Sequence, residues 1–67
     1  MSIAKVTEVI SSSSVGIEDA VRQGIARASK TLDQIQGVWV SDIKCNVENG
    51  DVVEWRVRLK ITFVLTD

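Results

Sequence analysis

The stretch GVWVSDIKCNVENGDVVEWRVRLKITFVL, residues 37–65, contains the features that decide the fold. β-branched and other apolar residues run along both halves of it, and Asn49-Gly50 lies between the halves. This dipeptide tolerates the positive φ angles of a type I′ turn and is the strongest short-range signal for a β-hairpin. The sequence therefore predicts two long antiparallel strands, over residues 37–47 and 51–65.

A two-residue turn at Asn49-Gly50 also predicts the register of the hairpin, because each step away from the turn adds one cross-strand pair. The expected pairs are Glu48 with Asp51, Ile43 with Arg56, Ser41 with Arg58, Val40 with Leu59, Trp39 with Lys60 and Val38 with Ile61.

Alternation along the two strands gives the hairpin two different faces, since cross-strand partners share a face. One face is apolar and is expected to cover a helix: Val38, Val40, Val57, Leu59, Ile61 and Phe63. The opposite face carries Gly37, Trp39, Ser41, Arg56, Arg58, Lys60 and Thr62, joined near the turn by Ile43, Cys45, Val47 and Val52. A partly apolar, partly cationic surface of this kind favours a subunit interface with a polar, ligand-sized portion.

The residues before the hairpin predict one more strand and one helix. IAKVTEVI, residues 3–10, reads as a strand, and the serines at 11–14 are expected to end it. Ser14 or Ser13 is expected to cap a helix over residues 15–35. Its apolar stripe contains Ile17, Ala20, Val21, Gly24, Ile25, Ala28, Leu32 and Ile35.

A chain of 67 residues predicts a single domain over residues 1–67, and a protein of this size buries only about 60% of its unfolded surface. Cys45 is the only cysteine and histidine is absent, which excludes an intrachain disulfide and disfavours a structural zinc. Oligomerisation is the remaining common way to stabilise so small a protein.

Composition also bears on partners and location. The formal net charge is −1, so the whole molecule has no field that would attract nucleic acid. No apolar run approaches the roughly 20 residues of a membrane span, and the N-terminal residues lack a signal-peptide pattern. We therefore expect no nucleic-acid or membrane partner and a cytoplasmic location.

The order strand–helix–strand–strand, with these residues, resembles the dodecin family. The resemblance rests on KVTEVISSSS (5–14), GIEDAVRQGIARASKTL (16–32) and WRVRLKITFVL (55–65). It implies an α+β fold of β-α-β-β order, with a three-stranded antiparallel sheet wrapped around one helix. It also implies a hollow homododecamer that stores small molecules without turnover, a flavoprotein holding riboflavin or FMN. Some members of the family bind coenzyme A or calcium.

Two positions differ from the flavin-binding pattern of that family. Gly37 stands where those members carry a ring-stacking tryptophan at the start of the second strand, and Arg56 stands at the position of a flavin-bonding glutamine. The chain is thus similar to the subgroup that lacks the stacking tryptophan. Trp39 lies two residues further on, on the same face of the strand. The expected cofactor-binding residues are Gly37, Trp39, Arg56 and Arg58.

Several of these residues have a structural interpretation beside the functional one. Trp39 is either a stacking platform for a planar ligand or an oligomer contact covered by Lys60 or Arg58. The cations bind either an anionic ligand or carboxylates of a neighbouring subunit. The carboxylates near the turn form either a solvated turn or a calcium site across a symmetry axis, and no metal ligand is assigned: Asp42, Glu48, Asp51 and Glu54. Cys45 and Trp55 are expected to be packing residues.

Taken with these residues, the resemblance implies a non-enzymatic small-molecule binding and storage protein whose ligand is a flavin with altered contacts. The alternative is a flavin-free structural shell, or one that binds calcium or coenzyme A. A small enzyme that uses Arg56 and a carboxylate is disfavoured, because the chain has no histidine, tyrosine or nucleophile dyad.

Overall fold

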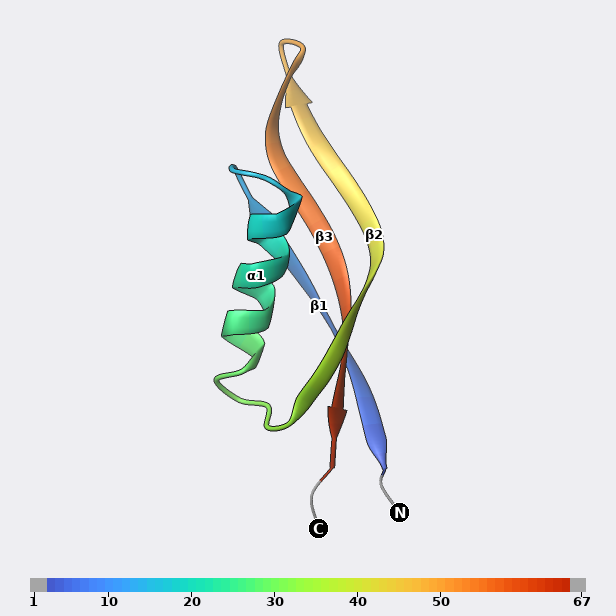
Figure 1. The fold of residues 1–67 in the computed structure, drawn as a ribbon. Helices are drawn as coiled ribbons and strands as arrows, with labels where there is room; N and C mark the ends of the chain where they lie inside the picture. Colours follow the sequence, from blue (N-terminus) through green and yellow to red (C-terminus); the bar gives the residue numbers. More distant parts are fainter. Residues whose placement is uncertain (1–2, 66–67) are drawn as a thin grey trace.

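The computed structural model describes residues 3–65 and has the element order β1 (Ala4–Ser13), α1 (Ile17–Ala28), β2 (Ile35–Glu48) and β3 (Asp51–Val64). The strands form one antiparallel sheet in the order β1-β3-β2, and α1 packs along one side of it (Figure 1). The predicted β-α-β-β architecture is confirmed. Within residues 3–65, no helix is long and apolar enough to cross a membrane.

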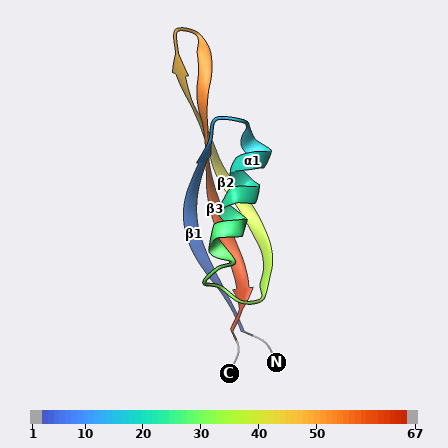
Figure 2. The same cartoon turned by 90° about the vertical axis from the view of Figure 1, so that its left-hand side faces the viewer.

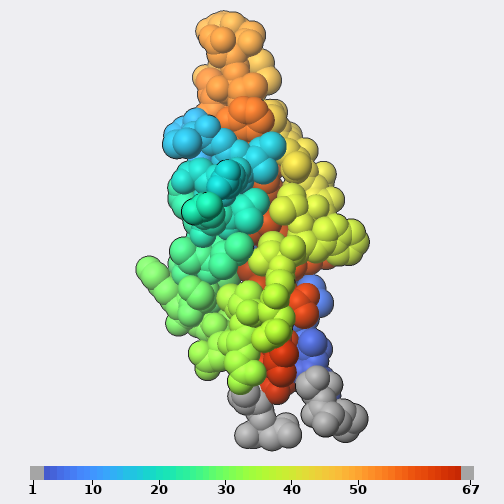
Figure 3. Space-filling model, viewed as in Figure 1, coloured from blue at the N-terminus to red at the C-terminus, as the bar shows by residue number. Residues whose placement is uncertain are grey.

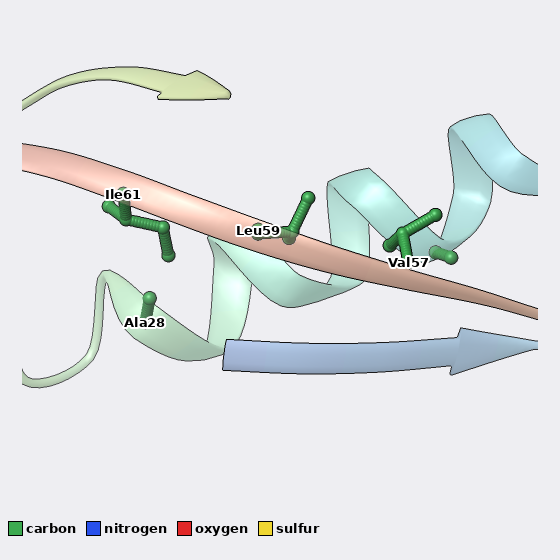
Figure 4. Packing of buried hydrophobic residues seen from close by; sticks show 5 residues of the cluster. Ala28, Val57, Leu59 and Ile61 are labelled. Atoms are coloured by element: carbon green, nitrogen blue, oxygen red, sulfur yellow. The ribbon is translucent and has the colours of Figure 1, made fainter. Parts of the chain in front are cut away.

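The core lies between α1 and the central strand β3. Val57, Leu59 and Ile61 are completely buried and pack with Ala20 and Ala28 of the helix (Figure 4). Burying side chains of this kind stabilises a fold by about 1.5–3 kcal/mol each. The prediction that this face of the hairpin covers the helix is therefore confirmed. Partly buried residues around this core are Val9, Ile17, Val21, Leu32, Ile35, Val38 and Val40.

Gly24 allows α1 to approach the sheet closely. A Cβ atom at this position would lie 2.6 Å from Leu59 Cδ1 and 3.1 Å from Ser11 Cβ. Both distances are shorter than ordinary van der Waals contact. The absence of a side chain at Gly24 therefore sets the distance between the helix and β3.

The predicted helix over residues 15–35 is too long, since α1 spans only Ile17–Ala28. The chain turns after Ala28, and Gln34 adopts a φ angle of 55°, which lies outside the right-handed helical region. Ile35 then begins β2 opposite Phe63. Ile35 packs against the core as predicted, but it does so from a strand. Its pairing with β3 takes the place of the helical conformation that the periodicity predicted.

The prediction that the serines at 11–14 end the first strand is wrong. β1 continues to Ser13, and Ser11, Ser12 and Ser13 pair with successive residues of β3. Because these serines pair with β3, their backbone N–H and C=O groups have hydrogen-bond partners in the sheet. The serine hydroxyls therefore do not have to compete for these backbone groups.

The helix start also differs from the expected cap at Ser14 or Ser13. The N-cap residue is Gly16, which makes no side-chain capping bond. Ser13 organises the turn instead: its Oγ accepts hydrogen bonds from Val15 N at 2.9 Å and Gly16 N at 3.4 Å. The same hydroxyl donates to Asp19 Oδ2 at 2.6 Å. Ser13 thus links the end of β1 to the first turn of α1.

The hairpin turn is confirmed. Asn49 and Gly50 have φ angles of 51° and 81°, as a type I′ turn requires, and Glu48 pairs with Asp51. The hairpin end extends beyond α1 in two perpendicular views (Figure 2), and the space-filling view shows its orange tip standing clear of the helix (Figure 3).

Two β-bulges change the predicted register in the middle of the hairpin. Val53 is an extra residue in β3 near the turn, and Ser41 is an extra residue in β2 further along. The two insertions cancel, so Val38, Trp39 and Val40 have the predicted partners.

Between the bulges the predicted pairs of Ser41 with Arg58 and Ile43 with Arg56 are wrong. The observed pairs are Asp42 with Arg58, Ile43 with Val57, Lys44 with Arg56 and Cys45 with Trp55. A shift of one residue exchanges the two faces of a strand. Ile43 and Cys45 therefore share the helix-side face with Val57 and Trp55, and not the opposite face as expected.

Candidate ligand-binding face

The sheet face opposite α1, which we call the outer face, is organised in rows of three residues, one from each strand. Cross-strand partners define four successive rows: Val6–Thr62–Gly37, Glu8–Lys60–Trp39, Ile10–Arg58–Asp42 and Ser12–Arg56–Lys44. The four expected ligand-binding residues, Gly37, Trp39, Arg58 and Arg56, therefore occupy consecutive rows of one face. Rows on the same face of a sheet are roughly 7 Å apart, so these residues span about 20 Å.

Trp39 is 64% exposed and has a cation beside its ring. Lys60 Nζ lies 4.6 Å from the ring centroid, within the range of a cation–π interaction. The same nitrogen lies 3.9 Å from Glu8 Oε1. Lys60 therefore lies beside Trp39 within one chain, with Glu8 near the same ammonium, whereas the role of Trp39 as an oligomer contact or a stacking platform stays a prediction.

The two arginines are half exposed and have loose partners within the chain. Arg58 Nη1 lies 4.0 Å from Glu8 Oε2, and Arg56 Nη2 lies 3.4 Å from Glu54 Oε1. Arg56 Nε also donates to Ser12 Oγ at 3.4 Å. Exposed ion pairs of this length contribute at most about 1 kcal/mol each. The guanidinium groups can therefore exchange these partners for a ligand at little cost.

A groove of about 180 Å³ lies beside the two arginines, lined by Ile10, Asp42, Lys44, Arg56 and Arg58. Sequence reasoning missed Glu8, Ile10 and Lys44 as members of this surface. Pairing β1 with β3 by alternation would have placed Glu8 and Ile10 there. Lys44 could not be placed, because only the bulge at Ser41 brings it to the outer face.

The carboxylates near the hairpin turn do not converge on one point within the chain. Glu54 accepts hydrogen bonds from Asn46 Nδ2 at 2.7 Å and from Arg56. Over the described range 3–65, no group of three or more histidine, cysteine or acidic residues is arranged to hold a metal ion. A calcium site formed between copies of the chain stays a prediction.

A three-stranded sheet covered by one helix on one side, with an aromatic residue and cations on the opposite side, defines a small protein of β-α-β-β architecture. A family model described as Dodecin matches residues 3–66. The chain belongs to the dodecin family.

Three relatives show how similar the chain is to known dodecins. Dodecin from Thermus thermophilus is 31% identical over 65 residues, which are 97% of this chain and 94% of the relative. The structure of dodecin from Streptomyces coelicolor has a TM-score of 0.92 and 36% identity, covering 98% of this chain and 94% of that one. A calcium dodecin from Mycobacterium tuberculosis, described as calcium chelating with a novel calcium-binding site, has a TM-score of 0.81 and 25% identity, covering 96% and 91%.

The expected subgroup without a stacking tryptophan is not supported. An indole is present on the outer face: Trp39 lies in the row next to Gly37 and is largely exposed.

Proposed function

We propose that this protein is a non-enzymatic small-molecule binding and storage protein of dodecin type, whose ligand is a flavin such as FMN or riboflavin. The observation that carries the proposal is the exposed ring of Trp39 on the open sheet face, between Gly37 in one neighbouring row and Arg58 in the other. An aromatic platform beside cations suits a planar ligand that bears a phosphate.

Gly37 provides room for the ring system. Among the described residues, no atom outside Gly37 and its two chain neighbours lies within 4 Å of the position that a Cβ would occupy there. A flat ring can therefore lie over the backbone at Gly37 with one side against Trp39. Arg58 and Arg56 follow along the same face, and their planar donor groups match a phosphate or carboxylate.

We propose further that a complete site forms between copies of the chain, in the homododecamer that the resemblance implies. The groove of about 180 Å³ is smaller than the roughly 300–1,000 Å³ of typical ligand pockets. Apolar side chains exposed on the outer face, including Val6 at 54% and Ile10 at 57%, also favour a covering surface. A second outer face placed over the first would enclose the ligand and bury these residues.

The chemistry of the face supports binding without turnover. Its polar side chains are arginine, lysine, carboxylates and hydroxyls, and the chain contains no histidine or tyrosine. Histidine, which exchanges protons near neutral pH, is the most common acid–base catalyst, and its absence from the sequence favours binding over turnover.

The test is a titration of riboflavin and FMN, followed by quenching of flavin fluorescence, with the wild-type protein and Trp39→Ala. Loss of the stacking surface is expected to weaken binding about tenfold, since an aromatic pair contributes up to about 1.5 kcal/mol beyond its buried area. Trp55→Phe is the matched control, because Trp55 pairs with Ser13 and Cys45 on the helix side. Absence of quenching at tens of micromolar wild-type protein would exclude the flavin ligand.

A second candidate is a flavin-free shell that holds calcium or coenzyme A. Arg56 in place of a flavin-bonding glutamine favours this reading, as does the cluster of Lys44, Arg56 and Arg58 around one groove, which suits phosphates. The similarity to a calcium dodecin supports the calcium version. A rise in melting temperature with calcium, or with coenzyme A and no response to flavins, would favour this candidate.

A further inference from the structure

The row Glu8–Lys60–Trp39 places a cation at the surface that the proposed ligand would use. Lys60 lies on the central strand, with Glu8 opposite it on β1 and Trp39 opposite it on β2. Its ammonium is 3.9 Å from the carboxylate and 4.6 Å from the ring centroid. The Lys60 side chain is 35% exposed, so it can be reached by a ligand that approaches Trp39.

The positive charge of Lys60 is incompletely neutralised. Its carboxylate partner, Glu8, is shared with Arg58, whose Nη1 lies 4.0 Å from the other carboxylate oxygen. The outer-face rows and the adjoining Glu54 together carry four cations and three carboxylates: Lys44, Arg56, Arg58 and Lys60 against Glu8, Asp42 and Glu54. The surface around Trp39 therefore remains attractive to an anion.

A planar ligand meets this cation in one of two ways. If the ligand stacks on the ring surface beside Lys60, it displaces the ammonium, and a neutral ligand offers the ammonium nothing in return. If it stacks on the opposite surface, the ammonium stays near it and attracts negative charge on the ligand. In both arrangements an anionic ligand gains an interaction that a neutral ligand with the same ring system lacks.

We propose that Lys60 is a specificity-determining residue of this site, selecting planar ligands that carry negative charge close to the Trp39 ring over their neutral analogues. The inference rests on the proposed function for the identity of the ring system. The charge preference at Trp39 is nevertheless a property of the chain alone and can be measured without a flavin.

The first experiment compares the affinities of FMN and riboflavin for the wild-type protein and for Lys60→Met, which keeps an unbranched side chain, one atom shorter, and removes its charge. The preference for FMN over riboflavin is expected to fall by up to about fivefold, which is the effect in water of one unit charge as close as about 4 Å. Lys30→Met removes the same charge from an exposed position after α1 and is expected to leave the preference unchanged. An unchanged preference in Lys60→Met would overturn the inference.

The second experiment uses collisional quenching of Trp39 fluorescence by iodide and by neutral acrylamide, in a Trp55→Phe background so that Trp39 is the only emitter. The ratio of iodide to acrylamide quenching is expected to fall about twofold in Lys60→Met and to stay constant in Lys30→Met. A constant ratio in Lys60→Met, or a Trp39 that neither quencher reaches, would overturn the inference. If the ratio falls but no flavin binds, the proposed flavin function fails while the charge selection stands.

Discussion

Replacing Gly24 with alanine is expected to destabilise the protein, although alanine is the better helix former. The substitution gains about 1 kcal/mol of helix propensity. The new methyl group would meet Leu59 Cδ1 at 2.6 Å and Ser11 Cβ at 3.1 Å. Leu59 is completely buried between Val57 and Ile61, so its methyl group has little room to move away.

Overpacking of a filled core costs about 1–3 kcal/mol of unfolding free energy. Over most of that range, the cost is larger than the gain in helix propensity. We expect a net loss of about 1 kcal/mol of unfolding free energy and a melting temperature about 4–8 °C lower, measured by circular dichroism. Ala26→Gly, at an exposed position of α1, provides the control that measures the propensity contribution alone.

A second variant tests the contact itself. Leu59→Val removes volume from the partner of the new methyl group, so Gly24→Ala should be better tolerated in that background. The coupling between the two substitutions is expected to exceed about 0.5 kcal/mol, as is usual for residues in contact. A higher melting temperature for Gly24→Ala alone would show that α1 does not pack against β3 as closely as described.

Two further predictions concern the outer face and the start of the helix. The double variant Gly37→Trp with Arg56→Gln is expected to tighten flavin binding in a fluorescence titration. The space at Gly37 is open, and the resemblance places a stacking ring at position 37 and an amide at position 56. Unchanged flavin affinity would contradict the correspondence of these two positions with the family pattern. Ser13→Ala is expected to lower the unfolding free energy in urea by about 1 kcal/mol, because its hydroxyl serves two backbone N–H groups and Asp19, whereas Ser14→Ala should have little effect.

The hairpin could be predicted well because its signals are local. Asn49-Gly50 specifies the turn, and alternation specifies which side chains of residues 57–61 face the helix. The register failed only between the two bulges, where Val53 and Ser41 are inserted. No local sequence pattern predicts these insertions. They depend on how two long twisted strands pack against a helix and extend beyond it at the hairpin end.

The helix ends were harder to predict because two structures compete for the same residues. Ile35 continues the helical periodicity and is also β-branched, and only the availability of Phe63 as a strand partner decides between them. Similarly, Ser11 to Ser13 have the composition of a loop but form a strand, because β3 is long enough to pair with them.

The candidate site was predicted in part. Trp39, Arg56 and Arg58 do share the outer face with Gly37, as the alternation indicated. Their arrangement in rows with Glu8 and Lys44 required the pairing of β1 with β3 and the bulge at Ser41, neither of which the hairpin sequence contains.

The sequence by itself determined the order of the elements, the turn, and the alternating faces, because these follow from interactions between residues close along the chain. Only the tertiary structure decided where α1 ends, which residues of β2 face outward, and how Lys60 comes to lie between Glu8 and Trp39. Those features depend on contacts between β1, β2 and β3, and a contact between distant segments is fixed by the packing of the whole sheet against its helix.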